Sequence, residues 1–510
     1  MGAQRAWVWA RSPYNCLVFT ISDKLYTAEG VRQLDQLAMA AEQVDGYALM
    51  CRAGAALVEA ARARWTSHNA WLVVCGGGNN GGDGYVAARL ARASGVEVTV
   101  MAVIDPAQLT GAAARAADEW RACGGQVLPP EAPIADDISL VIDALLGTGL
   151  NRPVSGSVAR LLERLNALPC PRIAVDIPSG IHADTGAVMG SALLADQTVT
   201  FIGKKRGLYT ADGPQHAGRI VFERLDVPST VYASGPPAGH LLASDFARHV
   251  LAPRSRNSHK GQFGHVLVVA GQAGMSGAAR LAGEGALRVG AGLVTLATAA
   301  VHASQLNIGL PELMVQAVSG GEDLTQVAER ATVLAVGPGL GTSAWAQGLL
   351  RACLTDSRPL VVDADGLNLL AQEAVPQRSD WVLTPHPGEA ARLLDTDTAS
   401  VQADRLAAAH TLAQRFQAVV LLKGCGSVLA APSGDWAVCA TGNPGMATAG
   451  CGDVLTGVVA GLLAQGYDSW HAASLGAVVH GLAGDRAAEQ GERGLLASDV
   501  ARELRGAVNG

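Results

Sequence analysis

The stretch Val73–Ala91, VVCGGGNNGGDGYVAARLA, joins the end of an apolar run to a glycine-rich turn and then to a helix. After the turn, apolar and small residues recur at helical spacing, which predicts a helix over Tyr85–Ala93. The turn holds Gly76-x-Gly78-x-x-Gly81, the glycine spacing of dinucleotide-binding strand–turn–helix units. This stretch therefore predicts an α/β fold with a ligand site at the end of a strand.

The same stretch argues against a hydride-transferring dehydrogenase, which needs more than this glycine spacing. Such enzymes hold the ribose with an acidic residue at the end of the second strand. Glu97 lies early in that strand, and Asp105 follows it too far along the chain. The turn also places Asn79, Asn80 and Asp83 in the space of a pyrophosphate, where a carboxylate repels phosphate unless a cation lies between them. The whole segment GGGNNGGDG is therefore more specific than the generic fingerprint.

Composition and charge limit the classes of protein to which the chain can belong. The chain has 510 residues, of which 49% are hydrophobic and 16% charged, so it predicts two large domains or about three of ~150 residues. A net charge of -7 gives no electrostatic reason to bind nucleic acid or an anionic membrane. No stretch approaches the ~20 apolar residues of a membrane span. Nine scattered cysteines without a CxxC pair predict reduced thiols in a cytoplasmic enzyme.

Apolar runs and amphipathic segments alternate through two successive regions, which predicts two three-layer, doubly wound α/β domains with mainly parallel sheets. We expect an extension over residues 1–24, a first domain over 25–233, a linker over 234–240 and a second domain over 241–508. In such sheets ligands bind outside the carboxyl ends of the strands. Three motifs of the first domain lie at such ends, namely GGGNNGGDG, DALLGTGLNRP and DIPSG.

These three motifs resemble the epimerase half of the NAD(P)H-hydrate repair enzymes. The second half resembles the partner dehydratase of the ribokinase-like superfamily, with HKGQFGHVLVVAG, VGPGLG, VVDADGLN, TPHPGE, LLKGCGS and GNPGMATAGCGDVLTG in family order. The resemblance covers about Tyr26 to Asp499 and implies a Rossmann-like first domain and a ribokinase-like second domain.

The activity that this resemblance implies is repair of NADHX and NADPHX, the hydrates formed when water adds to the nicotinamide ring. The first domain would interconvert the R and S hydrates. The second would use a nucleotide to phosphorylate the hydroxyl of the S hydrate and dehydrate it to NADH or NADPH, with release of AMP and phosphate.

The first domain offers a dinucleotide pocket and one candidate acid–base group. Backbone amides at the strand ends are expected to face phosphate. The expected pocket residues are Asn79, Asn80, Gly81, Gly82, Asp83, Gly147, Thr148, Gly149, Leu150, Asn151, Arg152, Pro153 and Asp176. Asp176 is the candidate for proton transfer, because epimerisation needs a titratable group near the ring. The alternatives are that Asp176 only hydrogen-bonds the turn that it begins and that Arg152 is only solvated.

Asn80, Asp143 and Ser179 present an amide oxygen, a carboxylate and a hydroxyl from three strand ends. Hard oxygen donors without His or Cys suit a cation of the alkali or alkaline-earth groups. The resemblance implies potassium at these positions. The alternative is that Asn80 and Ser179 only cap local turns.

Asp453 is the candidate general base of the second domain. The turn Gly450–Asp453 opens an apolar helix, so its backbone amides form an anion hole for a transferring phosphoryl group, with Asp453 adjacent. The alternative for Asp453 is a helix N-cap. The resemblance implies nucleotide binding by Lys423, Gly424, Cys425, Gly426, Ser427 and Gly452, and hydrate binding by Ala278, Gly339, His386 and Asp453. For Lys423, His386, Ala278 and Gly339 a purely structural role is the alternative.

Asp363 and Asp365 are candidates to neutralise phosphates through Mg²⁺, or they only shape their turn. The sequence does not show whether ADP or ATP is the phosphoryl donor. We expect ADP, because the fused form of the family usually uses it. A vitamin or sugar kinase fused to a nucleotide-binding domain stays open, as does a non-catalytic first domain. The expected partners are the hydrates, ADP and further copies of the chain in a homo-oligomer, without nucleic acid or membrane.

Overall fold

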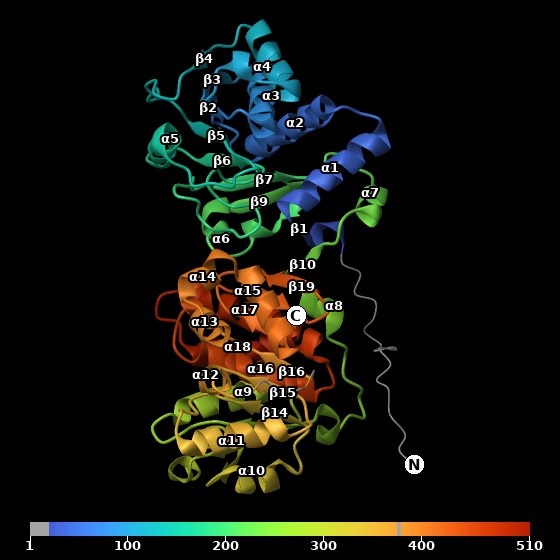
Figure 1. The fold of residues 1–510 in the computed structure, drawn as a ribbon, viewed down its shortest axis with the longest axis vertical. Helices are drawn as coiled ribbons and strands as arrows, with labels where there is room; N and C mark the ends of the chain where they lie inside the picture. Colours follow the sequence, from blue (N-terminus) through green and yellow to red (C-terminus); the bar gives the residue numbers. More distant parts are fainter. Residues whose placement is uncertain (1–19, 375–377, 379) are drawn as a thin grey trace.

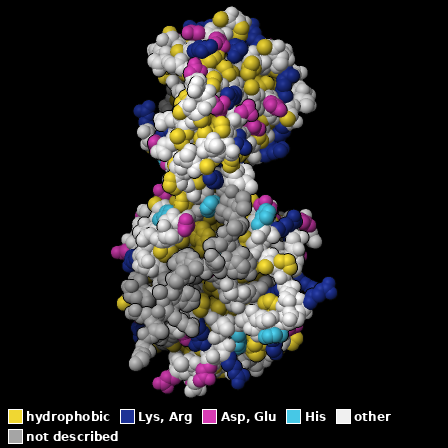
Figure 2. All heavy atoms as spheres, turned by 90° about the vertical axis from the view of Figure 1, so that its right-hand side faces the viewer, with side chains coloured by type: hydrophobic (Ala, Val, Ile, Leu, Met, Phe, Trp, Pro, Cys, Tyr) yellow, Lys and Arg dark blue, Asp and Glu magenta, His cyan; other side chains and the backbone are white. Residues whose placement is uncertain are grey.

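The computed structural model describes residues 20–374, 378 and 380–510, which form two lobes joined at a narrower waist (Figures 1 and 2). Most of the expected N-terminal extension, residues 1–19, lies outside the described residues. Within the described part of the chain, eight cysteines are free. None of its helices is both long and apolar enough to cross a membrane.

The first lobe is built on a parallel sheet with strand order β4-β3-β2-β5-β6-β7-β9. The chain adds strands outward from β2 on one side and then from β5 on the other, so the order reverses between these two strands. The strands are β2 (Ala70–Cys75), β3 (Glu97–Ala102), β4 (Val127–Leu128), β5 (Leu140–Ala144), β6 (Arg172–Val175), β7 (Gln197–Phe201) and β9 (Arg219–Glu223).

Helices cover both faces of this sheet because its strands are apolar on both sides. In β2, Trp71 and Val73 pack with α1 to α4, whereas Leu72 and Val74 pack with α5. Successive side chains of a strand point to opposite faces, so each face needs its own cover. The helices are α1 (Ala28–Glu42), α2 (Gly46–Arg64), α3 (Asn79–Ala93), α4 (Gly111–Ala122), α5 (Gly156–Asn166), α6 (Gly213–Ala217) and α7 (Ser229–Ser234).

The second lobe contains a larger sheet with order β13-β12-β11-β14-β15-β16-β17-β18-β19-β10-β1-β8. It is parallel from β13 to β17, and β18 and β19 then add antiparallel. The strands of this lobe are β10 (Gly239–Leu242), β11 (His265–Val269), β12 (Leu293–Thr298), β13 (Met314–Ala317), β14 (Val333–Val336), β15 (Leu360–Val362), β16 (Trp381–Leu383), β17 (Val419–Leu422), β18 (Ser427–Ala430) and β19 (Trp436–Cys439).

The second lobe is also three-layered. Val266 and Val268 of β11 pack with α9, α16, α17 and α18, and Leu267 and Val269 pack with α10 to α15 on the other face. The helices are α8 (Phe246–Val250), α9 (Ser276–Val289), α10 (Gly321–Ala328), α11 (Ala344–Thr355), α12 (Ala364–Leu370), α13 (Pro387–Leu394), α14 (Thr398–Ala403), α15 (Arg405–Phe416), α16 (Cys451–Ala464), α17 (Ser469–Ala487) and α18 (Ala497–Ala507). The predicted fold class, two doubly wound α/β domains, is confirmed.

The larger sheet continues from the second lobe into the first. β10, which overlaps the expected linker 234–240, pairs with β19 on one side and with β1 (Lys24–Tyr26) on the other. β1 in turn pairs with β8 (Lys204–Lys205) of the first lobe. The two lobes therefore share backbone hydrogen bonds as well as side-chain contacts.

A buried arginine fixes this junction. Arg405 is 1% exposed, and its guanidinium donates to Leu422 O and Lys423 O, each at 3.2 Å, and to Thr210 Oγ1 of the first lobe at 3.2 Å. Thr210 Oγ1 donates onward to Gly426 O at 3.0 Å. A buried charge is tolerated only when its donors are satisfied, so this hydroxyl is part of what holds the lobes together.

We expect Thr210→Val to destabilise the junction, because the isosteric side chain leaves one buried Arg405 donor and the Gly426 carbonyl without their hydroxyl partner. The cost should be about 1–3 kcal/mol, measured as a lower urea midpoint of the full chain. The exposed Thr396→Val is the matched control and should leave the midpoint nearly unchanged. Equal midpoints for the two variants would show that the Thr210 hydroxyl contributes nothing.

Candidate functional site

The first site lies where the strand order of the smaller sheet reverses, between β2 and β5. The loops after these parallel strands leave from the same edge and meet there. Gly76 N donates to Ala144 O at 2.9 Å, which ties the two strand ends together. The motifs GGGNNGGDG and DALLGTGLNRP are therefore neighbours in space.

Helix α3 begins at Asn79, so the prediction that it begins at Tyr85 is wrong. The segment NNGGDG forms the first turns of the helix, and its glycines serve close packing instead of a turn. A Cβ on Gly81 would lie 2.1 Å from Gly76 O, and one on Gly84 would lie 2.6 Å from Ala144 Cβ. The absence of side chains lets the helix N-terminus approach the strand ends, at some cost in helix propensity.

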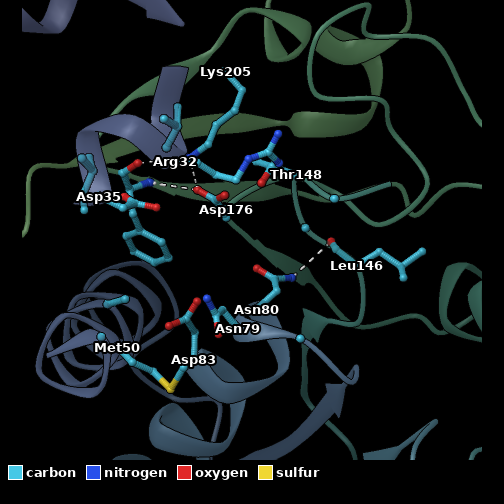
Figure 3. Close-up of a pocket in the computed structure, with 18 of the residues that line it drawn as sticks. Arg32, Asp35, Met50, Asn79, Asn80, Asp83, Leu146, Thr148, Asp176 and Lys205 are labelled. Atoms are coloured by element: carbon cyan, nitrogen blue, oxygen red, sulfur yellow. Dashed lines mark hydrogen bonds and ion pairs between the residues drawn. The ribbon is translucent and has the colours of Figure 1, made fainter. Parts of the chain in front are cut away.

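A cavity of about 630 Å³ opens over this helix N-terminus (Figure 3), a volume typical of small-molecule and cofactor sites. The predicted pocket residues that line it are Asn79, Asn80, Asp83, Gly147, Thr148, Gly149, Leu150, Asn151, Arg152 and Asp176. Gly81, Gly82 and Pro153 are not among its lining residues. Gly82 instead packs under α2, where a Cβ would lie 2.6 Å from Met50 Sδ.

Three charged lining residues were not predicted, namely Arg32 and Asp35 from α1 and Lys205 from β8. In the sequence, Arg32 and Asp35 have the pattern of the solvated face of an amphipathic helix. Lys205 carries one signal that sequence reasoning could have used, since it closely follows the apolar strand QTVTF. Proximity to the cavity arises only from the tertiary fold.

Asp176 stands at the carboxyl end of β6 in the left-handed backbone region, with φ of 66°. Its Oδ1 accepts hydrogen bonds from Phe201 N at 3.1 Å and Thr200 Oγ1 at 3.4 Å, and it forms an ion pair with Lys205 Nζ. The Lys205 side chain is 1% exposed and also donates to Phe201 O at 3.1 Å. Asp176 is thus anchored to the end of β7 and lines the cavity at the same time.

Asp143 and Ser179 are fully buried beside this cavity. Ser179 N and Oγ donate to the Asp143 carboxylate at 2.8 and 2.6 Å. Leu146 N donates to Ser179 Oγ at 2.8 Å, and Asn80 Nδ2 donates to Leu146 O at 3.2 Å, so the three predicted oxygen donors belong to one network. Burial raises the pKa of Asp143 to about 6, and no cationic side chain within residues 20–374, 378 and 380–510 opposes that shift.

The second site lies at the corresponding reversal of the larger sheet, between β11 and β14. Ala278 at the start of α9 and Gly339 after β14 meet there, since a Cβ on Gly339 would lie 3.0 Å from Ala278 Cβ. Asp365, after β15, accepts a hydrogen bond from Gly341 N at 2.8 Å and so holds the same turn. The two predicted hydrate-binding residues are therefore adjacent.

Lys423, at the end of β17, is the centre of a charge cluster. Its Nζ donates to Asp363 Oδ1 at 2.6 Å and lies 3.7 Å from Glu389 Oε2. The other Asp363 oxygen accepts from Thr456 Oγ1 of α16 at 2.6 Å. Burial by itself would lower the pKa of Lys423, but Asp363 and Glu389 outweigh it, so this pKa is raised. A Cβ on Gly452 would lie 3.3 Å from Lys423 Nζ, which places the start of α16 against the cluster.

Asp453 lies in the first turn of α16, whose N-cap position is Gly450 and not Asp453. Burial raises the pKa of Asp453 to about 7; the negative charge of Asp363 adds to this shift and Lys423 opposes it. A carboxyl that titrates near neutrality beside a helix N-terminus has the properties of a general acid or base.

His386 and the segment Lys423–Ser427 have structural contacts as well. His386 is the N-cap of α13, and its Nδ1 accepts from Gly388 N at 3.0 Å while Nε2 lies 3.3 Å from Glu389 Oε1. In the predicted nucleotide-binding segment, Cys425 O accepts from Ala211 N at 3.2 Å. That segment is therefore also part of the contact between the lobes.

Known families match both halves of the chain. A family model described as NAD(P)H-hydrate dehydratase matches residues 266–505, and one described as YjeF-related protein N-terminus matches residues 46–207. The first match contains the Lys423 cluster and Asp453, and the second contains most of the cavity lining.

Similarity to complete proteins extends over almost the whole chain. A bifunctional NAD(P)H-hydrate repair enzyme of Coxiella burnetii is 45% identical over 486 residues, 95% of this chain and 99% of that protein. The bifunctional repair enzyme of Escherichia coli is 40% identical over 491 residues, 96% of this chain and 95% of that protein. The structure of an ADP/ATP-dependent NAD(P)H-hydrate dehydratase from Bacillus subtilis, co-crystallised with ATP and Mg²⁺, is 32% identical, covers 53% of this chain and 97% of its own, and has a TM-score of 0.50. The chain belongs to the family of bifunctional NAD(P)H-hydrate repair enzymes.

Proposed function

We propose that the two reactions of NAD(P)H-hydrate repair are divided between the two carboxyl-edge sites, with the first cavity as epimerase site and the Lys423–Asp453 cluster as dehydratase site. The enzyme interconverts the R and S hydrates of NADH and NADPH and dehydrates the S hydrate at the expense of a nucleotide. Family membership along nearly the whole chain favours this activity over an ordinary vitamin or sugar kinase. The polar lining of the first cavity supports a catalytic first domain.

The observation that carries the dehydratase assignment is Asp453, whose carboxyl has no hydrogen bond or ion pair with a described residue, next to the ion pair of Lys423 with Asp363. Asp453 takes the proton of the hydrate hydroxyl as that oxygen attacks the donor phosphate. The amides at the start of α16 and the Lys423 ammonium stabilise the charge that develops on the phosphoryl group. The phosphate then leaves, the adjacent ring carbon loses a proton to solvent, the ring recovers its double bond, and AMP and phosphate are released.

The hydrate and nucleotide contacts are proposed from the positions that the fold brings together. Ala278, Gly339 and His386 would contact the hydrate, and Gly424, Cys425, Gly426, Ser427 and Gly452 would contact the nucleotide together with Lys423. Asp363 and Asp365 supply the hard oxygen donors that Mg²⁺ prefers, and they would hold Mg²⁺ that arrives with the phosphates and offsets their charge. We propose ADP as the phosphoryl donor.

In the epimerase site, Asp176 is the proposed acid–base group, and the backbone amides at the start of α3 with Gly147–Pro153 would hold the dinucleotide. Asn80, Asp143 and Ser179 would hold K⁺. The fit rests on their shared network and on Asp143, a buried carboxylate whose pKa burial raises to about 6, since a nearby cation would stabilise its charged form.

Domain boundaries, location and assembly complete the proposal. The first domain would span residues 25–233 and the second 241–508, ranges that contain both family matches. Free cysteines support a cytoplasmic location. Exposed apolar side chains near the edge strand β13 (Val301, Ile308 and Met314) support a homo-oligomer.

We expect Asp453→Asn to reduce nucleotide-dependent dehydration at least ~100-fold, because the amide cannot take a proton. Nucleotide binding should persist. The measurement is the recovery of reduced-nicotinamide absorbance from the S hydrate with ADP. Asp499→Asn, a carboxyl in the first turn of α18, is the matched control and should behave as wild type. Near-normal recovery by Asp453→Asn would refute this mechanism.

The dehydration rate should rise with pH through about 7. The base form of Asp453 is the active one, and its raised pKa means that it is protonated and inactive below that range. The initial rate at saturating hydrate and ADP, followed across this range, measures the rise. A rate that falls as pH increases through 7 would mean that Asp453 acts as an acid instead.

Asn80→Ala and Asp143→Ala should remove the stimulation of epimerisation by K⁺, because each deletes one proposed oxygen ligand. The R-to-S rate is measured against KCl concentration, with dehydration by the same variants as an internal control for the second lobe. Unchanged K⁺ stimulation in both variants would place the ion elsewhere.

A further inference from the structure

Four ionisable side chains from four separate elements face the cavity of the first lobe. Asp176 follows β6, Lys205 belongs to β8, Asp35 to α1 and Asp83 to α3, and all four line the cavity. Figure 3 shows Asp176 and Lys205 on one wall and Asp83 on the opposite wall, with the cavity between them. A ring that lies in this cavity therefore has a titratable group on each side.

The Asp176 carboxylate is held by donors on one oxygen only. Lys205 Nζ, Phe201 N and Thr200 Oγ1 all meet Oδ1. Within the described part of the chain no donor meets Oδ2, so this oxygen remains available to a ligand in the cavity. A carboxylate oxygen that faces a ligand in this way can accept a proton from it.

The Asp83 carboxyl is in the opposite situation. It has neither a hydrogen bond nor an ion pair with any described residue, and burial raises its pKa well above the usual range. The negative charges of Asp176 and Asp35 add to this shift, and Lys205 opposes it. The Cys75 thiol beneath it stays neutral, because burial raises its pKa too. Burial and the neighbouring carboxylates therefore favour the protonated form of Asp83, which can donate a proton.

We propose that Asp83 is a second catalytic residue of the epimerase, the general acid that acts across the cavity from the base Asp176. This inference rests on the function proposed above for Asp176. It assigns to Asp83 a proton transfer in addition to contact with the hydrate.

The chemistry of the hydrate requires two such groups. Water adds to the enamine double bond of the reduced ring at the carbon bonded to the ring nitrogen, so the epimeric carbon carries both a hydroxyl and that nitrogen. Asp176 removes the hydroxyl proton as the carbon–oxygen double bond forms, the carbon–nitrogen bond breaks, and Asp83 protonates the nitrogen. The ring is then open and the carbon is a planar aldehyde.

Ring closure reverses these transfers on the other face of the aldehyde. The aldehyde rotates, the nitrogen attacks its second face and returns its proton to Asp83, and Asp176 returns its proton to the oxygen. Both carboxyls regain their starting state, and no oxidant, reductant or nucleotide is consumed. An acid and a base on opposite walls match this sequence, because one proton is removed from the oxygen while another is delivered to the nitrogen in the same step.

The test uses the full chain without nucleotide, so that dehydration is idle, with purified R hydrate and the appearance of S hydrate followed by chromatography. Asp83→Asn should lower kcat about 100-fold or more with little change in KM. It should also abolish the fall of kcat at alkaline pH that loss of the Asp83 proton produces in the wild type. Asp118→Asn, an exposed carboxyl on α4, is the matched control.

Asp35→Asn provides a second measurement that does not depend on the folding of Asp83→Asn. Removing the Asp35 charge lowers the pKa of Asp83, so the alkaline fall of kcat should move to lower pH. Asp176 and Lys205, whose charges also act on the pKa of Asp83, stay in place in this variant, as do the cavity arginines Arg32 and Arg152. An alkaline limb that does not move in Asp35→Asn would overturn the assignment.

Asp176→Asn separates this inference from the function on which it rests. If Asp176→Asn is inactive while Asp83→Asn keeps the wild-type kcat, or changes only KM, Asp83 merely binds the hydrate and the inference fails. If both variants epimerise normally, the proposed epimerase site itself is wrong. Loss of kcat in both, with retained KM, supports the two-residue mechanism.

Discussion

Parallel strand direction is the constraint on which both sites depend. It brings the carboxyl ends of successive strands to one edge, and the strand order reverses at each site, between β2 and β5 in the smaller sheet and between β11 and β14 in the larger one. Residues that are distant in sequence meet there, such as Asp143 with Ser179 and Asp363 with Lys423. Both lobes have this arrangement of strand ends, so one architecture supports two different reactions.

Close backbone approach is the second requirement, and it explains much of the glycine content. Helices α3 and α16 reach the strand ends because glycines remove the side chains that would keep them away. A Cβ on Gly81 would lie 2.1 Å from Gly76 O, and one on Gly452 of α16 would lie 3.3 Å from Lys423 Nζ and 3.7 Å from Asp363 Oδ2. Each helix N-terminus is thereby brought to the place where an anionic ligand is expected.

The sequence predicts the strands and the motif-bearing loops well, because apolar runs and polar strand ends are local signals. The run Trp71–Val74 lies within β2, and the DIPSG motif follows β6. The sequence does not reveal that the helix begins at Asn79, because glycine usually indicates a turn. Only the close packing around Gly81 explains why glycines occur in the first turns of this helix. Local pattern cannot show that β8 pairs with β1, which brings Lys205 toward Asp176. The pairing of β10 across the junction is hidden for the same reason.

The two sites have a similar arrangement of charged residues, although their folds differ and do not require it. Each contains a strand-end aspartate paired with a lysine, Asp176 with the buried Lys205 and Asp363 with the partly exposed Lys423. Each also contains an aspartate near the start of a glycine-containing helix, Asp83 of α3 and Asp453 of α16, whose carboxyl has no hydrogen bond or ion pair with any residue that the structure describes.

The lysine neutralises the first carboxylate, so the second carboxyl titrates according to its own burial and residual charge. Burial and two nearby carboxylates raise the pKa of Asp83 well above its usual range, which suits a proton donor. The pKa of Asp453 reaches only about 7, which leaves a base available at neutral pH. The roles that we propose, an acid in one lobe and a base in the other, thus correspond to the degree to which the same kind of carboxyl is shielded from water and from its neighbouring lysine.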